Sequence, residues 1–394
     1  MTTDHLAAFR SLAADLRSAF AQWRPGEPRD EGRFRDRALR CFRLQYRGIG
    51  AYRRYCDRRG GTPESVGDWR DVPPVPTAAF RSVPLLVGDD PGAAEVEFRT
   101  SGTSRGASER GRHPVLDSGL YRASLEPPFR HFVLPDPGGP GDGPEEHRVR
   151  ILSLLPPVEE APDSSLCWMA DAVMERFGSD GSATVARGRA ALARAGSDPG
   201  GALDWEAARA RVEEARRASE PLVVLATTLA VAEWTEHLAA GGRRLELPPG
   251  SRLMDTGGAK GREGLGRSDV LEAVEERLGL PPRSVINEFG MTELLSQRYA
   301  PSAGPGAGWL EGPPWLRTRA LDPVTLEEVP EGEVGLLCHH DLANAGSVSV
   351  VLTEDRGRVR DGRVQHLGRS AGSPPRGCSL ATAELLDARD GAGE

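Results

Sequence analysis

The chain has 394 residues, which at roughly 150 residues per domain corresponds to two or three domains. Its 50 basic and 58 acidic residues give a net charge of -8, which argues against a nucleic-acid binder that neutralises many phosphates. No apolar run approaches the roughly 18 residues that a membrane span needs, and residues 1–20 lack the apolar stretch of a signal peptide. These features predict a cytoplasmic protein without a membrane span.

Cysteine and lysine usage restricts the chemistry available to the chain. The five cysteines are odd in number, scattered and free of any C-x-x-C pair, so neither a disulfide framework nor a zinc ribbon is expected. Arginine fills every Lys or Arg position except Lys260. A reaction that needs a mobile ammonium group therefore depends on Lys260, for which the alternative interpretation is an exposed loop charge.

The first 60 residues carry apolar side chains at helical spacing. They fall into two groups, which begin at Leu6 and at Phe34, and predict two amphipathic helices. Pro73, Pro74 and Pro76 end this region.

The middle of the chain alternates short apolar runs with helix-like stretches. Residues 135–144, PDPGGPGDGP, predict a surface loop. The expected strands lie at residues 149–155, 222–226, 253–255, 285–289 and 334–338, and the expected helices at residues 205–219, 229–239 and 269–278. This alternation predicts an α/β fold with mixed or parallel sheets, and Asp361-Gly362 predicts a hairpin turn in a strand-rich C-terminal part.

A loop rich in hydroxyls and glycine follows an apolar lead-in at Phe98. It comprises Thr100, Ser101, Gly102, Thr103 and Ser104. Such a loop offers backbone N–H groups and hydroxyls to an anionic ligand, because glycine lets the backbone approach closely. The pattern is not that of a P-loop, and an ordinary polar turn is the alternative to phosphate binding.

A second stretch of interest runs from Asn287 to Glu293. It contains a strand, a break at Gly290 and a Thr-Glu pair where a helix is expected to start. By itself the pattern is typical of a strand-to-helix turn capped by Thr292. Beside a phosphate loop Glu293 has a second use, since Mg²⁺ prefers one or two carboxylates together with phosphate oxygens.

The order of these motifs carries a resemblance to a known family. The TSGT loop is followed by GMTE, then by T-E-D at residues 353–355 and L-G-R at residues 367–369, which is the motif order of adenylate-forming enzymes. More closely, the chain resembles the acyl-protein synthetase (LuxE-type) family of fatty-acid ligases, which are similar to phenylacetate-CoA ligases. The matching stretches, within about residues 70–385, are DTGGAKGR (255–262), GMTELLSQ (290–297), DLAN (341–344) and RGCSL (376–380).

The resemblance implies an α/β fold like that of adenylate-forming enzymes, with a large N-terminal domain and a short or truncated C-terminal part. It implies an N-terminal helical segment at residues 1–70 and a core domain at residues 71–366. A short segment at residues 367–394 would carry Cys378.

The resemblance also implies roles for individual residues. The loop at residues 100–104 would hold the phosphates of ATP, Thr292 would contact the α-phosphate and Glu293 would bind Mg²⁺. Asp355 would bind the ribose hydroxyls, and Arg369 would lie near the nucleotide. Further nucleotide contacts are implied for Gly257 and Gly258, which would lie against the adenine, and for Ala259, Glu288, Phe289 and Gly290.

For the second half-reaction the resemblance nominates Cys378 as the nucleophile that carries the acyl group. A partner acyl reductase or acyl-carrier protein would then receive it. The sequence places Cys378 in a glycine-containing loop beside Arg376, whose guanidinium would favour the thiolate. Apart from the resemblance, a lone cysteine is more often an inert apolar residue.

Two departures from the family pattern bear on these roles. No lysine follows the TSGT loop, where Arg105, Arg110 and Arg112 stand instead and are candidates to serve the phosphates. Few residues follow Arg369, whereas full adenylate-forming enzymes end in a mobile domain that bears a catalytic lysine. A complete domain-rotation cycle is therefore not expected, and Lys260 is the candidate for any lysine role.

Together these features predict an ATP- and Mg²⁺-dependent ligase that activates a carboxylic acid, by resemblance a fatty acid, as acyl-AMP. The acyl group would pass to a cysteine thiol on the enzyme or on a partner protein. One alternative is an acyl-CoA ligase of the phenylacetate-CoA ligase type. The other is a non-catalytic homologue that serves as a binding subunit for a reductase.

Overall fold

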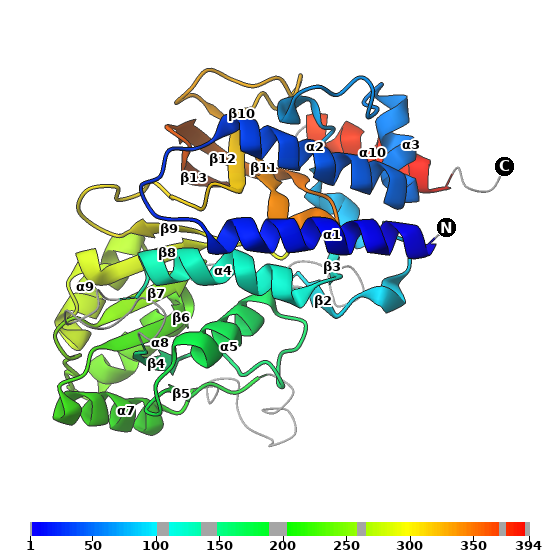
Figure 1. The fold of residues 1–394 in the computed structure, drawn as a ribbon. Helices are drawn as coiled ribbons and strands as arrows, with labels where there is room; N and C mark the ends of the chain where they lie inside the picture. Colours follow the sequence, from blue (N-terminus) through cyan, green and yellow to red (C-terminus); the bar gives the residue numbers. More distant parts are fainter. Residues whose placement is uncertain are drawn as a thin grey trace. The chain divides into compact units, whose positions relative to one another are not determined.

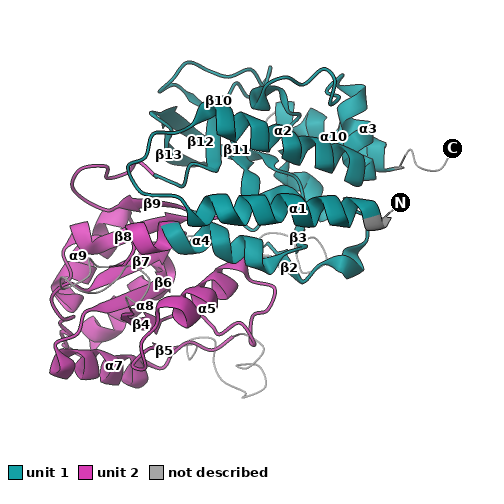
Figure 2. Ribbon diagram, in the orientation of Figure 1, with its two compact units in different colours: residues 1–127, 291–297, 311–394 teal, residues 128–290, 298–310 magenta. Residues whose placement is uncertain are grey.

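The computed structural model describes residues 2–100, 110–134, 148–188, 203–257, 265–369 and 376–390 (Figure 1). The chain forms two compact units (Figure 2). Unit 1 comprises residues 1–127, 291–297 and 311–394, and unit 2 comprises residues 128–290 and 298–310. These boundaries differ from the predicted domain boundaries at residues 70 and 366, because the N-terminal helices and the C-terminal helix both belong to unit 1.

Unit 2 is built on a six-stranded sheet in the order β5-β4-β6-β7-β8-β9, in which only the β8–β9 pair is antiparallel among the described strands. The strands are β4 (Arg150–Ser153), β5 (Ala183–Thr184), β6 (Leu222–Thr227), β7 (Arg252–Thr256), β8 (Val285–Phe289) and β9 (Arg298–Pro301). The helices are α5 (Ser165–Phe177), α7 (Trp205–Ala218), α8 (Thr228–Ala240), α9 (Arg267–Leu278) and the short 3₁₀ helix η6 (Pro282–Ser284). The elements predicted between residues 149 and 289 are confirmed, with small differences at their ends.

The parallel order of unit 2 follows from strands that are apolar throughout. Strand β6 is buried from Leu222 to Ala226, as expected for a parallel strand covered on both faces. Val224 of this strand packs in one buried cluster with Trp234 of α8 and Val274 of α9. This core fixes the carboxyl ends of β7 and β8 at one edge of the sheet.

Unit 1 contains a five-stranded sheet in the order β1-β12-β11-β10, with β13 paired to β12. Its strands are β1 (Val75–Pro76), β10 (Leu316–Leu321), β11 (Val334–Asp341), β12 (Val350–Arg360) and β13 (Arg363–Arg369). The predicted hairpin is confirmed, because Asp361 and Gly362 join β12 to β13 with φ angles of 50° and 68°. A separate hairpin of β2 (Val96–Arg99) and β3 (Arg112–Val115) flanks residues 101–109. The predicted mixed-sheet α/β fold is therefore confirmed.

The predicted N-terminal helices are confirmed as the first two helices of unit 1, and a third one follows them. The helices of this unit are α1 (Thr2–Ala21), α2 (Glu31–Gly48), α3 (Gly50–Arg58) and α10 (Arg376–Asp390), with α4 (Ser118–Phe132) continuing into unit 2. The 3₁₀ helices are η1 (Trp69–Asp71), η2 (Thr77–Arg81), η3 (Pro91–Ala93) and η7 (Leu342–Gly346). No helix within the described ranges is long and apolar enough to cross a membrane. The loop predicted at residues 135–144 lies outside those ranges.

Candidate active site

Several of the stretches singled out from the sequence meet in unit 1. Thr100 lies at the stem of the hydroxyl-rich loop, where its Oγ1 accepts a hydrogen bond of 2.8 Å from the backbone N–H of Gly111. Thr292 is tied to the same hairpin, because its carbonyl accepts a hydrogen bond of 2.7 Å from Nδ1 of His113 on β3. The remaining loop residues Ser101, Gly102, Thr103 and Ser104 lie outside the described residues.

Glu293 lies at the centre of a group of charged side chains in this unit. It is 8% exposed, and burial raises the pKa of its carboxyl group to about 7. The positive charges of Arg369 and Arg81 lower this pKa and the negative charge of Asp355 raises it, so all three groups lie within electrostatic range of Glu293. An additional cation close to this carboxylate would favour its ionised form further.

Asp355 is the second carboxylate of this group. Its Oδ1 lies 3.3 Å from Nε of Arg369 and 3.6 Å from Nε2 of His366, both on the neighbouring strand β13. Burial acts to raise the pKa of Asp355, but the hydrogen bond and charge of His366, together with the charge of Arg369, bring it below its usual value. Asp355 therefore remains an ionised hydrogen-bond acceptor at neutral pH.

The turn at Thr292 and Glu293 corrects one expectation. The sequence predicted a helix start after Gly290, but residues 292 and 293 form a turn, and the chain then continues to β9. The buried side chain of Ser296 donates a hydrogen bond of 2.7 Å to Asp341 at the end of β11. Such buried side-chain bonds fix the segment in an irregular conformation instead of a helix.

The arginines that follow the hydroxyl-rich loop also depart from expectation. Arg112 donates two hydrogen bonds to Glu97, at 2.9 and 2.7 Å, and Arg110 donates to the backbone carbonyls of Thr100 and Arg99. Both guanidinium groups thus stabilise the hairpin stem, which argues against the suggested phosphate role. Arg105 lies outside the described residues.

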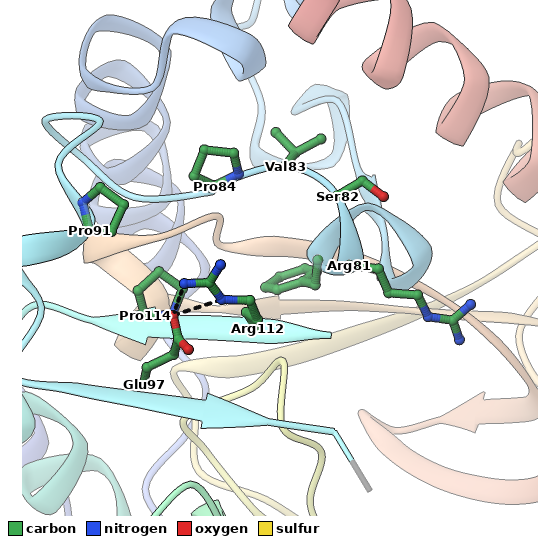
Figure 3. Close-up of a pocket in the computed structure, with 9 residues that line it drawn as sticks. Arg81, Ser82, Val83, Pro84, Pro91, Glu97, Arg112 and Pro114 are labelled. Atoms are coloured by element: carbon green, nitrogen blue, oxygen red, sulfur yellow. Dashed lines mark hydrogen bonds and ion pairs between the residues drawn. The ribbon is translucent and has the colours of Figure 1, made fainter. Parts of the chain in front are cut away.

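A hollow of about 220 Å³ opens beside the charged group (Figure 3). Val83, Pro84 and Pro91 line one side of it, and the Glu97–Arg112 pair lines the other. Figure 3 shows the side chain of Arg81 directed away from this pair. The positive charge of Arg81 lowers the pKa of Glu293. The sequence did not predict this role of Arg81.

The residues implied for the adenine side belong to unit 2. Thr256 at the end of β7 donates a hydrogen bond to the carboxyl group of Glu288 on β8. Burial raises the pKa of Glu288 to about 7; the bond from Thr256 lowers it, and the charge of Asp255 raises it. Gly257 follows with a φ of +80°, which allows the chain to turn at the sheet edge.

Phe289 and Gly290 stand where the chain leaves unit 2, and Met291 begins the short stretch that belongs to unit 1 (Figure 2). Along the chain, strand β8 with Glu288 is thus followed closely by the turn with Glu293. Gly258, Ala259 and Lys260 lie outside the described residues, so their implied roles stay predictions.

The surroundings of Cys378 correct the expectation of an activated thiol in a loop. Cys378 lies in the first turn of α10, is 4% exposed, and its sulfur is 3.5 Å from the carbonyl oxygen of Thr353. Burial, reinforced by the negative charge of Glu354, raises the pKa of the thiol to about 12. The side chain of Arg376 lies outside the described residues. The thiol is therefore protonated at neutral pH in this conformation.

Cys378 borders a groove of about 300 Å³ in unit 1. Leu352 and Glu354 of β12 line the groove, whereas Thr353 and Asp355 alternate with them along the strand. Because successive side chains of a strand point to opposite faces, Cys378 and Asp355 lie on opposite sides of β12. The groove is completed by apolar and hydroxyl side chains from β1, η2 and α10: Pro76, Thr77, Ala78, Ser379, Thr382, Ala383 and Leu386.

The oxygen atoms of this site suit a magnesium ion shared with a nucleotide. Among the described residues no group of three or more His, Cys, Asp or Glu side chains is arranged to hold a metal ion by itself. Mg²⁺ usually takes only one or two carboxylates and completes its shell with phosphate oxygens and water. Glu293 could supply such a carboxylate, because burial raises its pKa and a bound cation would lower that pKa again.

The fold is similar to that of acyl-CoA ligases of known structure. The chain is similar to 2-hydroxyisobutyryl-CoA ligase in complex with 2-HIB-AMP and CoA, with a TM-score of 0.55 and 15% identity over 86% of this chain and 68% of that chain. An open conformation of the same ligase gives a TM-score of 0.54 over 89% of this chain and 80% of that chain. The chain spans about half, 49%, of an ATP-bound RpMatB-BxBclM chimera.

The predicted resemblance to the acyl-protein synthetase (LuxE) family is confirmed, since that family's model matches residues 197–386. The long-chain-fatty-acid–luciferin-component ligase of Vibrio harveyi is 22% identical over 90% of this chain and 88% of its own length. The protein of the same description from Aliivibrio fischeri is 34% identical over 19% of this chain and 22% of its own length. The chain is thus a distant homologue of ligases of this family.

Proposed function

We propose that the protein activates a carboxylic acid with ATP and Mg²⁺ as an acyl-adenylate, and that a fatty acid is the substrate. The observation that carries the proposal is the group of Glu293, Asp355 and Arg369 beside the stem of the hydroxyl-rich loop in unit 1. The same residues stand in the motif order of the matched family. The distant similarity to fatty-acid ligases supports the choice of acid.

In this proposal the side chains of unit 1 bind and orient the nucleotide. Glu293 holds Mg²⁺, which when bound neutralises phosphate charge, and Asp355 accepts hydrogen bonds from the ribose hydroxyls. Arg369 and Arg81 add positive charge to the site. An oxygen of the substrate carboxylate forms a bond to the α-phosphorus, and the bond to pyrophosphate breaks. This reaction needs positioning and charge neutralisation but no protein nucleophile.

For the second step we assign the acyl acceptor to Cys378. A carbon–sulfur bond forms, the bond to AMP breaks, and the thiol proton passes to a phosphate oxygen of the departing AMP. The apolar lining of the groove suits the first carbons of an acyl chain. Because Cys378 and Asp355 lie on opposite sides of β12, this step also requires the first turn of α10 to leave its described position. An acyl reductase or an acyl-carrier protein would then accept the acyl group.

The buried thiol favours a second candidate, in which coenzyme A is the acceptor. A thiol with a pKa of about 12 is a weak nucleophile at neutral pH, whereas the free thiol of CoA needs no movement of α10. The two functions share the adenylation step. They differ in whether an acyl-CoA product forms.

The adenylation step is tested by ATP–pyrophosphate exchange over a panel of carboxylic acids of increasing chain length. We expect exchange in the native protein and its loss in Glu293→Ala. The exposed Glu327→Ala serves as the matched control and should retain exchange. Exchange that survives in Glu293→Ala, or that is absent from the folded native protein with every acid, would contradict the proposal. The latter result would favour a non-catalytic homologue that binds a reductase.

A further inference from the structure

The backbone around Glu293 is held by buried side chains that come from distant parts of unit 1. We name His113, Asp341 and Asn344 together the clasp. All three side chains are fully enclosed, at 0% exposure. Two of them belong to the DLAN stretch, for which the proposed reaction assigns no role.

Asn344 in η7 makes the most direct contact with this segment. Its Nδ2 donates a hydrogen bond of 2.8 Å to the carbonyl oxygen of Glu293, and its Oδ1 accepts one of 3.1 Å from the N–H of Leu295. Nδ2 also donates to the carbonyl of Val348 at 3.1 Å. The Asn344 amide therefore bridges Glu293 and Leu295 and ties them to Val348, in the segment that precedes β12.

Asp341 at the end of β11 shares the N–H of Leu295 with Asn344 and also bonds the side chain of Ser296. Its Oδ2 accepts from the N–H of Leu295 at 2.9 Å, and its Oδ1 accepts from the hydroxyl of Ser296 at 2.7 Å. The same carboxylate caps η7 through the N–H of Ala343 at 3.0 Å. Asp341 thus aligns the turn with the helix that carries Asn344.

His113 fixes the other side of Glu293. Because the carbonyl oxygen of Thr292 can only accept, Nδ1 of His113 carries the proton and donates to it across 2.7 Å. Its Nε2 is buried and has no hydrogen-bond partner among the described residues. An imidazole kept in the interior with one nitrogen unsatisfied carries a cost, which the single bond to Thr292 must offset.

We propose that Asp341, Asn344 and His113 are positioning residues that hold the Glu293 carboxylate in the orientation needed to bind a divalent cation with ATP. This inference rests on the proposed assignment of that cation to Glu293. Within the turn the N–H of Leu294 donates to the carbonyl of Met291, whereas the carbonyls of Thr292 and Glu293 and the N–H of Leu295 bond these side chains. Outer-shell residues that orient a ligating carboxylate typically change metal affinity or activity about 10- to 100-fold when they are replaced.

The test measures Mn²⁺, as a substitute for Mg²⁺, binding to the full chain in the presence of ATP by electron paramagnetic resonance. Asn344→Leu and His113→Leu remove the donors to the carbonyls of Glu293 and Thr292. We expect each to weaken Mn²⁺ binding about 10- to 100-fold while leaving ATP binding without the cation unchanged. His113→Asn, whose amide can replace the Nδ1–H donor, should restore most of the affinity.

Two further variants separate positioning from simple loss of stability. Ser347→Ala removes an equally buried hydrogen bond, from the hydroxyl of Ser347 to the carbonyl of Leu85, without touching the turn. We expect it to lower the melting temperature but to leave Mn²⁺ binding unchanged. Glu293→Gln defines the complete loss of the ligand.

The outcomes are distinguishable. If Glu293→Gln leaves Mn²⁺ binding unchanged, the proposed role of Glu293 fails. If Glu293→Gln abolishes binding but folded Asn344→Leu and His113→Leu bind Mn²⁺ normally, the positioning inference is overturned. Equal losses in His113→Asn and His113→Leu would also contradict it, as would a loss in Ser347→Ala. If Asn344→Leu does not fold, the two His113 variants decide.

Discussion

The two sides of strand β12 hold reactive groups in opposite states of ionisation. On one side Asp355 lies beside Arg369 and His366, and its carboxylate is stabilised in the ionised form. On the other side Cys378 meets the carboxylate of Glu354 and the carbonyl of Thr353, and its thiol is stabilised in the neutral form. The Asp355 side thus presents an ionised acceptor in the described conformation, whereas the thiol on the other side is held in its unreactive neutral form.

This difference separates the two proposed steps in structural terms. The proposed adenylation uses Asp355, which is ionised in the described conformation, and Glu293, whose raised pKa a bound cation would lower. Acyl transfer requires a change at the first turn of α10 before the thiol can react. The following experiments test whether the two sides differ to the expected extent.

The largest expected effect concerns the reactivity of Cys378. With a pKa of about 12, its thiolate fraction at pH 8 should be about a thousandfold below that of an ordinary cysteine. We therefore expect iodoacetamide to modify Cys378 about a thousandfold more slowly than glutathione, with a rate that rises about tenfold per pH unit up to pH 10. Peptide mass spectrometry measures this rate. A modification rate that stops rising below pH 9 would show that the Cys378 thiol is activated. The two sides of β12 would then not differ as described.

Glu288 extends the comparison to a carboxyl group in unit 2, whose raised pKa of about 7 is caused chiefly by burial. At a pH below about 4.5, the pKa of a glutamate in the unfolded chain, the burial of Glu288 does not lower the free energy of unfolding. As the pH rises from 4.5 to 7, the burial lowers that free energy progressively. We expect Glu288→Gln, which can keep the bond to Thr256, to raise the free energy of unfolding by up to about 3 kcal/mol at pH 8 and by little at pH 5. Urea unfolding of the two proteins at pH 5 and at pH 8 measures this free energy. A gain in the free energy of unfolding that is equal at the two pH values would contradict the raised pKa of Glu288.

Replacing Asp355 tests the ionised side of β12. Asp355→Asn removes the charge that would accept the ribose hydroxyls, and we expect ATP to bind about 10- to 100-fold more weakly, as for the loss of a charged hydrogen-bond acceptor. Titration calorimetry measures the affinity. Asp322→Asn is the control, because Asp322 caps an exposed turn of the same unit. Equal effects of the two substitutions would count against a nucleotide role for Asp355.

The smallest expected effect concerns the docking of α10. Arg59, which follows α3, holds Glu384 of α10 through an ion pair of 2.6 Å at the surface. Arg59→Ala should raise the iodoacetamide reactivity of Cys378 by up to about fivefold, because an exposed pair contributes at most about 1 kcal/mol. Arg33→Ala, which breaks the surface pair with Asp30 away from α10, should leave the rate unchanged. A decrease in Arg59→Ala would contradict the idea that docking protects the thiol.

Much of the fold could be predicted because its signals are local. The apolar run of β6, the Asp361-Gly362 turn and the spacing of apolar residues in α1 and α2 each determine an element from a few neighbouring residues. The helix expected after Gly290 was wrong for the opposite reason. That segment is shaped by Asp341 and Asn344, which lie more than 40 residues further along the chain.

The site was predictable only as far as its motifs extend. Glu293, Asp355 and Arg369 were found through their order in the sequence, and the structure brings them together in unit 1. Arg81 and His113 carry no motif, because their relation to Glu293 and Thr292 arises from folding alone. The state of the Cys378 thiol could not be predicted either, since the burial that raises its pKa arises from folding and leaves no signal in the neighbouring sequence.

The central claim is that adenylation takes place at Glu293 and that the acyl group then passes to Cys378. The most direct measurement is the intact mass of the native chain and of Cys378→Ser after incubation with ATP, Mg²⁺ and a long-chain fatty acid, with ATP–pyrophosphate exchange followed in both. We predict one added acyl group on the native chain and none on Cys378→Ser, with equal exchange in the two proteins. Exchange without any acyl group on the native chain, together with acyl-CoA formation when CoA is added, would contradict the assignment of Cys378.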